Sequence, residues 1–215
     1  MTARAGLRPA SSQSRTPTAR WLAMLQDALL VVISGLFVWV HVTRVADGRI
    51  ASIPFAIEQA LLVGMFLTRR RSMATSNRPF EWIVAAGSWL PLMMRPDEGG
   101  DTSVAIGLGL QMGGLLMTFA GFLSLGRSFG VVAANRGLKV HGAYRIIRHP
   151  IYFSHLVTTT GFVIANPSPW NGGLFVVVTI CQLLRIRAEE RVLGETAEYA
   201  TYRAKVRWRL IPFVY

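Results

Sequence analysis

Charged side chains are scarce in this sequence, and acidic ones are scarcer than basic ones. Only 16% of the 215 residues are charged, with 11 Asp or Glu against 23 Lys or Arg, whereas 52% are hydrophobic. A soluble domain of this size needs a more polar surface, and the apolar residues here stand in long blocks. The shortage of charge therefore argues against a soluble fold and predicts an integral membrane protein.

Cysteine is nearly absent as well, and common catalytic and metal-binding patterns are not found. Cys181 is the single cysteine, so no intrachain disulfide can form, and its apolar surroundings indicate a small buried hydrophobe. The histidines lack tight metal-ligand spacing, so no metal site is expected. Ser128 and Ser154 have no convincing acid–base partner for a hydrolase triad, and no Gly-rich phosphate loop of the usual kind occurs.

Membrane topology explains the basic residues better than nucleic-acid binding does. A nucleic-acid-binding domain with a net charge of +12 would carry its basic residues beside a soluble core, whereas here they stand between apolar blocks. Residues 1–20 are rich in Ser, Thr, Pro and Arg and are predicted to be a disordered, basic cytoplasmic tail. The next apolar block has no small-residue cleavage site after it, which favours a retained span over a signal peptide.

Six apolar blocks are candidate membrane spans, so the sequence predicts an all-α, polytopic transmembrane helix bundle of about five or six spans. A helix needs ~20 residues to cross the hydrocarbon core, and the third, fifth and sixth blocks are shorter than that. The last two blocks flank a loop rich in Asn and Pro and are expected to form a helical hairpin inside the bundle. The blocks run from about Leu22 to Thr43, Ile50 to Thr68, Phe80 to Met94, Ser103 to Leu125, Ile151 to Ala165 and Trp170 to Leu184.

The distribution of Lys and Arg gives the expected orientation. With the N-terminus in the cytoplasm, the inside segments contain every Lys and Arg except Arg44, Arg49 and Arg95. Because positive residues are retained on the cytoplasmic face, an even number of spans with both termini in the cytoplasm is predicted. The inside segments in this layout are residues 1–20, 69–78, 126–150 and 185–215.

Polar and small residues within the spans indicate how the helices pack. Glu58 falls in the second span, where a carboxylate is costly unless it is paired or functional. We expect Glu58 to face the bundle and to hydrogen-bond to a neighbour, on the side of Gln59 or at Gln111. Five glycines in the fourth span indicate close approach of a neighbouring helix, namely Gly107, Gly109, Gly113, Gly114 and Gly121.

Two polar segments on the predicted cytoplasmic side carry the residues that could perform chemistry. The first extends from Ser128 to Tyr152. Within it, Pro150 suits the first turn of a helix, and His149 stands at that helix start, where free N–H groups favour an anion. An interfacial cluster, with Arg148 at the headgroups and Tyr152 in the aromatic belt, explains the same residues without a ligand.

The second polar segment begins with Arg185 to Glu190. Arg185 and Glu189 stand one helical turn apart, which suits a surface ion pair. It equally suits a carboxylate that holds a cationic ligand group beside an arginine that holds an anionic one. Because the helical hairpin joins the two polar segments, they are expected to meet, and together they predict a site for a zwitterionic cofactor at the cytoplasmic membrane face.

These residues resemble the isoprenylcysteine carboxyl methyltransferase family and the related phospholipid methyltransferases. The resemblance covers about residues 120–215 and implies a fold of membrane helices with the active site on the cytoplasmic side. With the tail over 1–20 and the N-terminal transmembrane helices over 21–125, both expected from composition, it makes residues 126–215 the methyltransferase catalytic region. The matching residues are Gly142 to Tyr152, Asn166 and Pro167, Arg185, Glu189 and Glu190, Tyr199, Tyr202, and Ile211 and Pro212.

The resemblance also implies the chemistry. S-adenosylmethionine is the expected methyl donor, and a lipophilic small molecule or membrane lipid, methylated at a carboxylate, is the expected acceptor. Arg185 matches the arginine near the substrate carboxylate, and Glu190 and His149 are weaker candidates for a base if the acceptor is an amine or a thiol. By position, the cofactor contacts are Arg136, Gly137, Leu138, Lys139, Tyr144, His149, Pro150, Ile151, Tyr152 and Glu189.

The residue types suit this assignment. Glu189 can hold the ammonium group of S-adenosylmethionine, His149 and nearby N–H groups can hold its carboxylate, and tyrosine faces tolerate its sulfonium. A carboxylate acceptor needs no general base, but it needs Arg185 to orient it and a pocket that removes its water.

Two other interpretations remain open from the sequence. The end of the chain, Val206 to Tyr215, also resembles membrane sterol reductases, which would place the phosphates of NADPH near Arg145, Arg207 and Arg209. A non-catalytic transporter subunit or scaffold would use the late polar clusters only as interfacial anchors. The concentration of charge at one face favours a surface site over a transport path.

Overall fold

The computed structural model describes residues 17–48, 50–68, 74–75, 79–87, 89–96, 100–125, 134–135, 138–194 and 196–215. Apart from one antiparallel pair of two-residue strands, β1 (Ala74–Thr75) and β2 (Ala134–Asn135), its regular structure is helical. The α-helices are α1 (Pro17–Ala46), α2 (Ile53–Thr68), α3 (Pro79–Gly87), α4 (Asp101–Leu125), α5 (Pro150–Ala165), α6 (Pro169–Leu193) and α7 (Ala197–Lys205). Short 3₁₀ helices are η1 (Ile50–Ser52), η2 (Leu90–Met93) and η4 (Gly142–Arg145).

The expected all-helical class is confirmed, and helices lie at each of the six apolar blocks. α4 and α6 are long and apolar enough to cross a membrane on their own, while α5 and parts of α1 and α2 are shorter apolar helices. The third block is the least regular, since it forms α3 and then η2, which contains Pro91. The number of complete spans stays a prediction.

Two element boundaries differ from the sequence expectation. α1 begins at Pro17, so the last residues of the predicted tail are helical, and residues 1–16 lie outside the described part. α6 does not end near Leu184 but continues to Leu193. The helix keeps its geometry through the basic and acidic residues at its end because none of them breaks a helix, and this continuation places Arg185 and Glu189 on a rigid element.

α4 and α5 pack closely because glycines of α4 leave room for the α5 backbone. A Cβ atom built at Gly107 would lie 2.4 Å from the carbonyl oxygen of Gly161, and one built at Gly114 would lie 2.3 Å from Oγ1 of Thr158. Gly107, Gly114 and Gly121 are spaced by seven residues, so they share one face of α4. By contrast, a Cβ at Gly109 would meet nothing within 4 Å. The glycine-packing prediction is therefore confirmed for this face of α4 only.

One end of the bundle is fastened by the connection between α5 and α6. Asn171 is fully buried, and its side chain accepts a hydrogen bond from the Arg95 N–H at 2.9 Å and donates to the carbonyl oxygens of Arg95 and Asn166 at 2.8 Å. The Ser168 hydroxyl caps α6 by accepting from the Asn171 N–H. These contacts fix the turn of the predicted helical hairpin and hold the segment after η2 against it.

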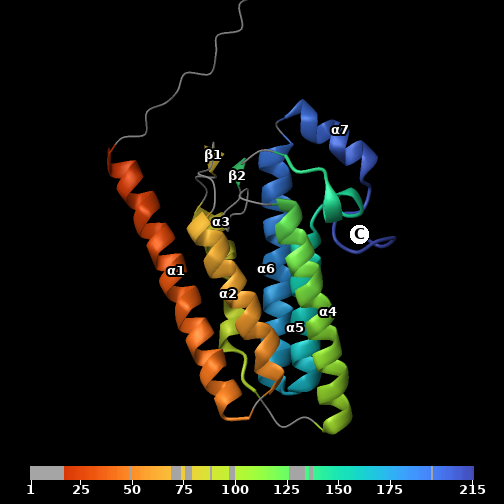
Figure 1. Cartoon of the computed structure of the whole chain (residues 1–215). Helices are drawn as coiled ribbons and strands as arrows, with labels where there is room; N and C mark the ends of the chain where they lie inside the picture. Colours follow the sequence, from red (N-terminus) through yellow and green to blue (C-terminus); the bar gives the residue numbers. More distant parts are fainter. Residues whose placement is uncertain are drawn as a thin grey trace, which may run out of the picture.

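The opposite end of the bundle carries the candidate site. Figure 1 shows α1, α2, α4, α5 and α6 side by side, with α7 and the C-terminal segment near the end where α5 begins and α6 ends. α7 contributes Tyr199 and Tyr202, which with Val206 form a buried cluster that also contacts Leu193 at the end of α6. The C-terminal third of the chain thus gathers around one end of the α5–α6 pair.

Candidate active site

The last residues of the chain hold the segment that precedes α5. The Arg148 and His149 N–H groups donate to the carbonyl oxygens of Trp208 and Arg209, both at 2.9 Å. His149 has a non-helical backbone and is followed by Pro150, which begins α5 as the sequence predicted. Because these two hydrogen bonds fix the backbone of Arg148 and His149 just before α5, the side chains of both residues project in fixed directions.

Glu190, near the end of α6, is the acceptor for three cationic or imidazole groups. Its Oε1 lies 3.0 Å from Nε of Arg148 and 3.3 Å from Nε2 of His149, and its Oε2 lies 2.9 Å from Nε of Arg209. The Glu190 side chain is only 8% exposed. This carboxylate therefore links three segments that are far apart in sequence: the start of α5, the end of α6 and the C-terminal segment.

Arg209 is held on both sides. Its Nη1 donates to the Tyr215 hydroxyl at 2.8 Å, and its guanidinium lies over the Tyr215 ring. Partial burial lowers the pKa of Arg209, but the hydrogen bond to Tyr215 and the negative charge of Glu190 outweigh it, so the net pKa is raised. The Tyr215 carbonyl oxygen accepts from the N–H groups of Leu210 and Ile211, which turns the chain end back onto itself.

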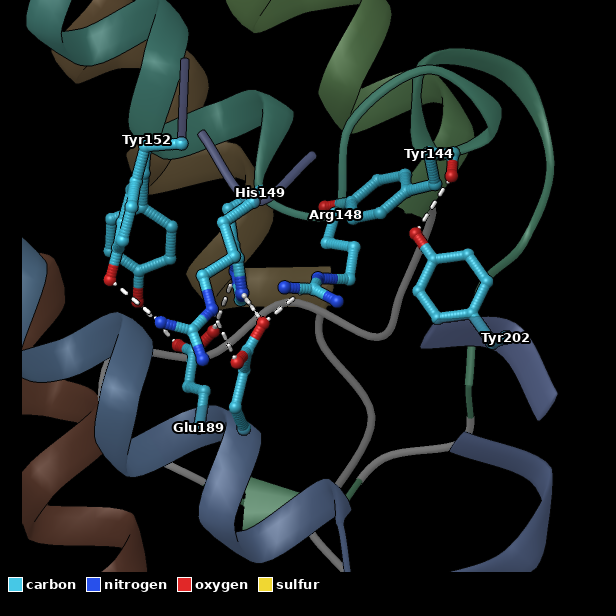
Figure 2. Close-up of polar contacts among 9 residues, drawn as sticks. Tyr144, Arg148, His149, Tyr152, Glu189 and Tyr202 are labelled. Carbon is cyan, nitrogen blue, oxygen red and sulfur yellow. Dashed lines mark hydrogen bonds and ion pairs between the residues drawn. The ribbon is translucent and has the colours of Figure 1, made fainter. Parts of the chain in front are cut away.

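Glu189, next to Glu190 in α6, has a different set of neighbours. Its Oε1 accepts a hydrogen bond from the Tyr152 hydroxyl, and its Oε2 lies 3.8 Å from Nδ1 of His149, which is longer than a hydrogen bond. The Arg185 guanidinium lies over the Tyr152 ring, 5.0 Å from its centroid. Figure 2 shows the side chains of His149 and Tyr152 reaching down to Glu189 on α6.

Tyrosines form the other wall of the site. The Tyr202 hydroxyl donates to the Tyr144 carbonyl oxygen at 2.7 Å, as Figure 2 shows. Burial raises the pKa of Tyr202 to about 12, with Arg148 opposing and Glu190 adding to the effect. Burial, and after it the nearby negative charge of Glu189, raise the pKa of Tyr144 as well. Both phenols stay neutral at physiological pH, so they present aromatic faces and hydroxyl groups without adding negative charge.

The structure brings most of the predicted site residues together. His149, Tyr152, Arg185, Glu189 and Glu190 lie in one connected set of contacts, and Tyr144 is held beside them by the hydrogen bond from Tyr202. Pro150 is buried as the first residue of α5. Lys139 is half-buried, and Arg136 and Gly137 lie outside the described residues.

One predicted cofactor contact, Ile151, faces elsewhere. Ile151 packs against Phe122 of α4, and a Cβ built at Gly121 would lie 2.8 Å from it. Leu138 packs against the cluster of Tyr199, Tyr202 and Val206, so it lies behind the tyrosine wall of the site. For Ile151 the reason is helical rotation: its neighbour Tyr152 points toward α6, so the preceding side chain is turned about 100° away, toward α4.

Sequence reasoning undervalued Arg148 and Arg209. From the sequence, Arg148 has a role only in the interfacial interpretation, at the headgroups, and Arg209 only as a phosphate contact of a reductase, yet both pair with Glu190. One signal could have pointed to them: Glu189 and Glu190 are adjacent, so they face different directions on a helix and need separate partners. Their partners come from segments more than 15 residues away, which a local pattern does not show.

Comparison with known families agrees with this site. Residues 102–198 match the model of the phospholipid methyltransferase family, to which the isoprenylcysteine carboxyl methyltransferases belong. The matched region runs from α4 to the start of α7 and contains every interacting site residue from Tyr144 to Glu190. Among curated proteins, no sequence matches the chain significantly. The resemblance read from the sequence is thereby confirmed, and the family match and the two long apolar helices together indicate a membrane methyltransferase.

Proposed function

From the match of residues 102–198 to the phospholipid methyltransferase family, we propose that this protein is an integral membrane enzyme that transfers a methyl group from S-adenosylmethionine to a lipophilic acceptor. The observation that carries the proposal is the pair of adjacent carboxylates, Glu189 and Glu190, with different surroundings. Glu190 is enclosed by cationic groups, whereas Glu189 meets a tyrosine hydroxyl and keeps one oxygen beyond hydrogen-bond distance of His149.

The residues around Glu189 suit a zwitterionic sulfonium compound. The Glu189 side chain is 23% exposed, so a ligand ammonium can reach its carboxylate. The rings of Tyr144 and Tyr152 offer aromatic faces to a sulfonium cation. The ring of His149 and the start of α5 attract a ligand carboxylate. When bound, S-adenosylmethionine would supply an electrophilic methyl group, and these side chains would orient that group and exclude water.

Arg185 is the proposed contact for the acceptor. Its guanidinium lies over the Tyr152 ring, 5.0 Å from the ring centroid, and a guanidinium suits an anionic group of a lipid, such as a carboxylate or a phosphate. A carboxylate acceptor, as in isoprenylcysteine substrates, needs only orientation and desolvation to attack the methyl group. An acceptor with an alkyl chain would reach this site sideways from the bilayer.

Glu190 is better suited to positioning than to proton transfer. Its three contacts with Arg148, His149 and Arg209 occupy both carboxylate oxygens. The same contacts engage Nε2 of His149, so neither of the two weaker base candidates is well placed to take a proton from an acceptor. We therefore assign Glu190 the role of holding His149 at the cofactor site.

The alternative functions fit the contacts less well. In the reductase interpretation, Arg209 would bind a phosphate of NADPH, but this guanidinium already pairs with Glu190 and donates to Tyr215. In the scaffold interpretation, the polar residues would be surface anchors, whereas Arg148, His149 and Glu190 are buried and interlocked. We propose that both termini lie in the cytoplasm. In sealed right-side-out vesicles, a cysteine introduced at either terminus should therefore resist an impermeant thiol reagent added outside. Labelling of that cysteine by the outside reagent would contradict this topology.

Binding of S-adenosylhomocysteine tests the proposal directly. Detergent-purified protein should bind it saturably in a calorimetric titration and should not bind NADPH. Glu189→Ala should weaken binding by at least ~10-fold, since a charge-assisted hydrogen bond contributes roughly 1.5–3 kcal/mol. Glu198→Ala, at an exposed glutamate of α7, is the matched control and should bind normally. A folded protein that binds only NADPH, or that binds neither compound, would refute the methyltransferase assignment.

A further inference from the structure

A second ionisable pair lies inside the bundle, away from the carboxylates of α6. Oε1 of Glu58 on α2 lies 3.2 Å from Nδ1 of His155 on α5. Glu58 is 2% exposed, and the side chain of His155 is 18% exposed. The sequence predicted that Glu58 would face the bundle and find a polar partner, which is confirmed, but the partner is His155 rather than Gln59 or Gln111.

The position of this pair relates it to the proposed active site. His155 follows Tyr152 by three residues, so the two side chains share a face of α5 and are separated by about 4.5 Å along the helix axis. Arg185 precedes Glu189 by one turn of α6 and lies over the Tyr152 ring. His155 and Arg185 therefore both lie about one helical turn further from the predicted cytoplasmic end of the bundle than the contact between Tyr152 and Glu189.

Aromatic residues lie on the side of the Glu58–His155 pair that faces away from the proposed active site. Phe55 of α2 and Phe162 of α5 are in ring contact at 4.8 Å and pack with Met94 and side chains of α6. The Glu58–His155 pair thus lies between this apolar cluster and the Tyr152–Glu189 contact. An acceptor that reaches the proposed cofactor site at Glu189 from the bilayer side, as proposed above, would have to pass the level of this pair.

The chemistry of the pair is that of an oriented base. A carboxylate that accepts from Nδ1–H of an imidazole fixes the tautomer in which Nε2 carries the lone pair, and it stabilises the imidazolium that forms when Nε2 takes a proton. His149 differs, because both of its ring nitrogens face carboxylates, Glu189 and Glu190. Among the described histidines near the site, His155 has the arrangement that proton removal requires.

We propose that His155, oriented by Glu58, is the general base for methyl transfer to lipophilic acceptors that must lose a proton, such as alkylamines and alkanethiols. This inference rests on the proposed function in its broad form, methyl transfer to a lipophilic acceptor. An alkylammonium first gives one proton to Nε2 of His155. The neutral amine then forms an N–CH₃ bond as the S–CH₃ bond breaks, its electron pair passes to sulfur, and a methylammonium and a thioether remain. His155 returns its proton to water.

The base can be tested by comparing two acceptors of equal chain length. Dodecylamine needs proton removal and dodecanoate does not, and both can be assayed with radiolabelled S-adenosylmethionine on the same detergent-purified protein. We expect wild type to methylate dodecylamine. His155→Gln should lower dodecylamine methylation by roughly 10²–10⁴-fold, the usual contribution of a general base, and should leave dodecanoate methylation and S-adenosylhomocysteine binding within about twofold of wild type.

Two further variants separate catalysis from folding. Glu58→Gln keeps the imidazole but removes the charge that stabilises its protonated form, so it should lower dodecylamine methylation less than His155→Gln does. His141→Gln, at an exposed histidine, is the matched control and should change neither acceptor. If His155→Gln impairs folding, the Glu58→Gln comparison between the two acceptors still provides the test.

The possible failures are distinguishable. Unchanged dodecylamine methylation in His155→Gln, or an equal loss of both acceptors with intact S-adenosylhomocysteine binding, would show that the pair is only structural and overturn the inference. Methylation of dodecanoate alone by wild type would also overturn it while leaving the proposed function in place. Absence of S-adenosylhomocysteine binding by wild type would overturn the proposed function itself.

Discussion

Removal of the Glu190 carboxylate should destabilise the protein more than removal of any one of its partners. Glu190→Ala leaves the guanidinium of Arg148, which is 7% exposed, without its anion. Breaking a buried pair in this way costs about 3–5 kcal/mol, because an uncompensated charge is left away from water. Arg209 is more exposed, at 28% for its side chain, so the contact between Arg209 and Glu190 should contribute only about 1 kcal/mol.

These magnitudes predict an asymmetric double-mutant cycle. Glu190→Ala should lower the thermal midpoint in detergent by roughly 6–20 °C, from about 2–4 °C per kcal/mol for a chain of this size. Arg209→Ala should lower it by only a few degrees. In the Glu190→Ala background, Arg209→Ala should have a smaller effect than in wild type, since the contact with Glu190 is already lost and only the contacts with Tyr215 remain to be removed.

The assay is thermal unfolding followed by intrinsic fluorescence, with S-adenosylhomocysteine binding measured at a temperature where each variant is folded. Glu190→Ala should also weaken that binding, because His149 loses the carboxylate at its Nε2. Glu198→Ala again serves as the exposed glutamate control. Equal and additive effects of Glu190→Ala and Arg209→Ala would refute the idea that Glu190 is a shared buried anchor.

Two other predictions follow from the packing and from the tyrosine wall. Gly114→Leu should lower the thermal midpoint strongly, because its side chain would collide with the backbone of α5, whereas Gly109→Leu, where a Cβ meets nothing within 4 Å, should be tolerated; similar midpoints for the two variants would contradict the packing scheme. Burial raises the pKa of Tyr202 to about 12 from an ordinary 10.0, so the stability that its neutral form contributes is fully present below about pH 10 and is lost as the pH rises through about 12. The difference in midpoint between wild type and Tyr202→Phe should therefore shrink between about pH 10 and pH 12, and a constant difference would show that this phenol does not titrate with unfolding.

The sequence predicted the local part of the site well because that part depends on neighbours in the chain. Pro150 lacks an N–H group and begins α5, and the four-residue spacing of Arg185 and Glu189 puts them on one helix. The short connection at Asn166–Ser168 forces α5 and α6 to run antiparallel. These constraints bring the start of α5 and the end of α6 to the same end of the bundle, whatever else the chain does.

Only the tertiary structure decided which residues of distant segments meet. Glu58 needed a polar partner in an apolar span, yet nothing in its own periodicity selects His155, 97 residues away. The pairing of Arg209 with Glu190 likewise depends on how the C-terminal segment runs beside the residues before α5. A helical repeat fixes which residues share a face but not the rotation of that face toward a neighbouring helix.

The same physical limit explains the outcomes for glycine and isoleucine. The amino-acid sequence determined that this chain is apolar, that its apolar blocks form helices, and that its basic residues lie in one set of loops. Each of those properties depends on residues that are neighbours in the chain. The sequence could not determine that Gly114 faces α5 while Gly109 does not, or that Ile151 faces α4 while Tyr152 reaches Glu189. Those choices were made by the close packing of one helix against another, where a rotation of a few tens of degrees changes every contact.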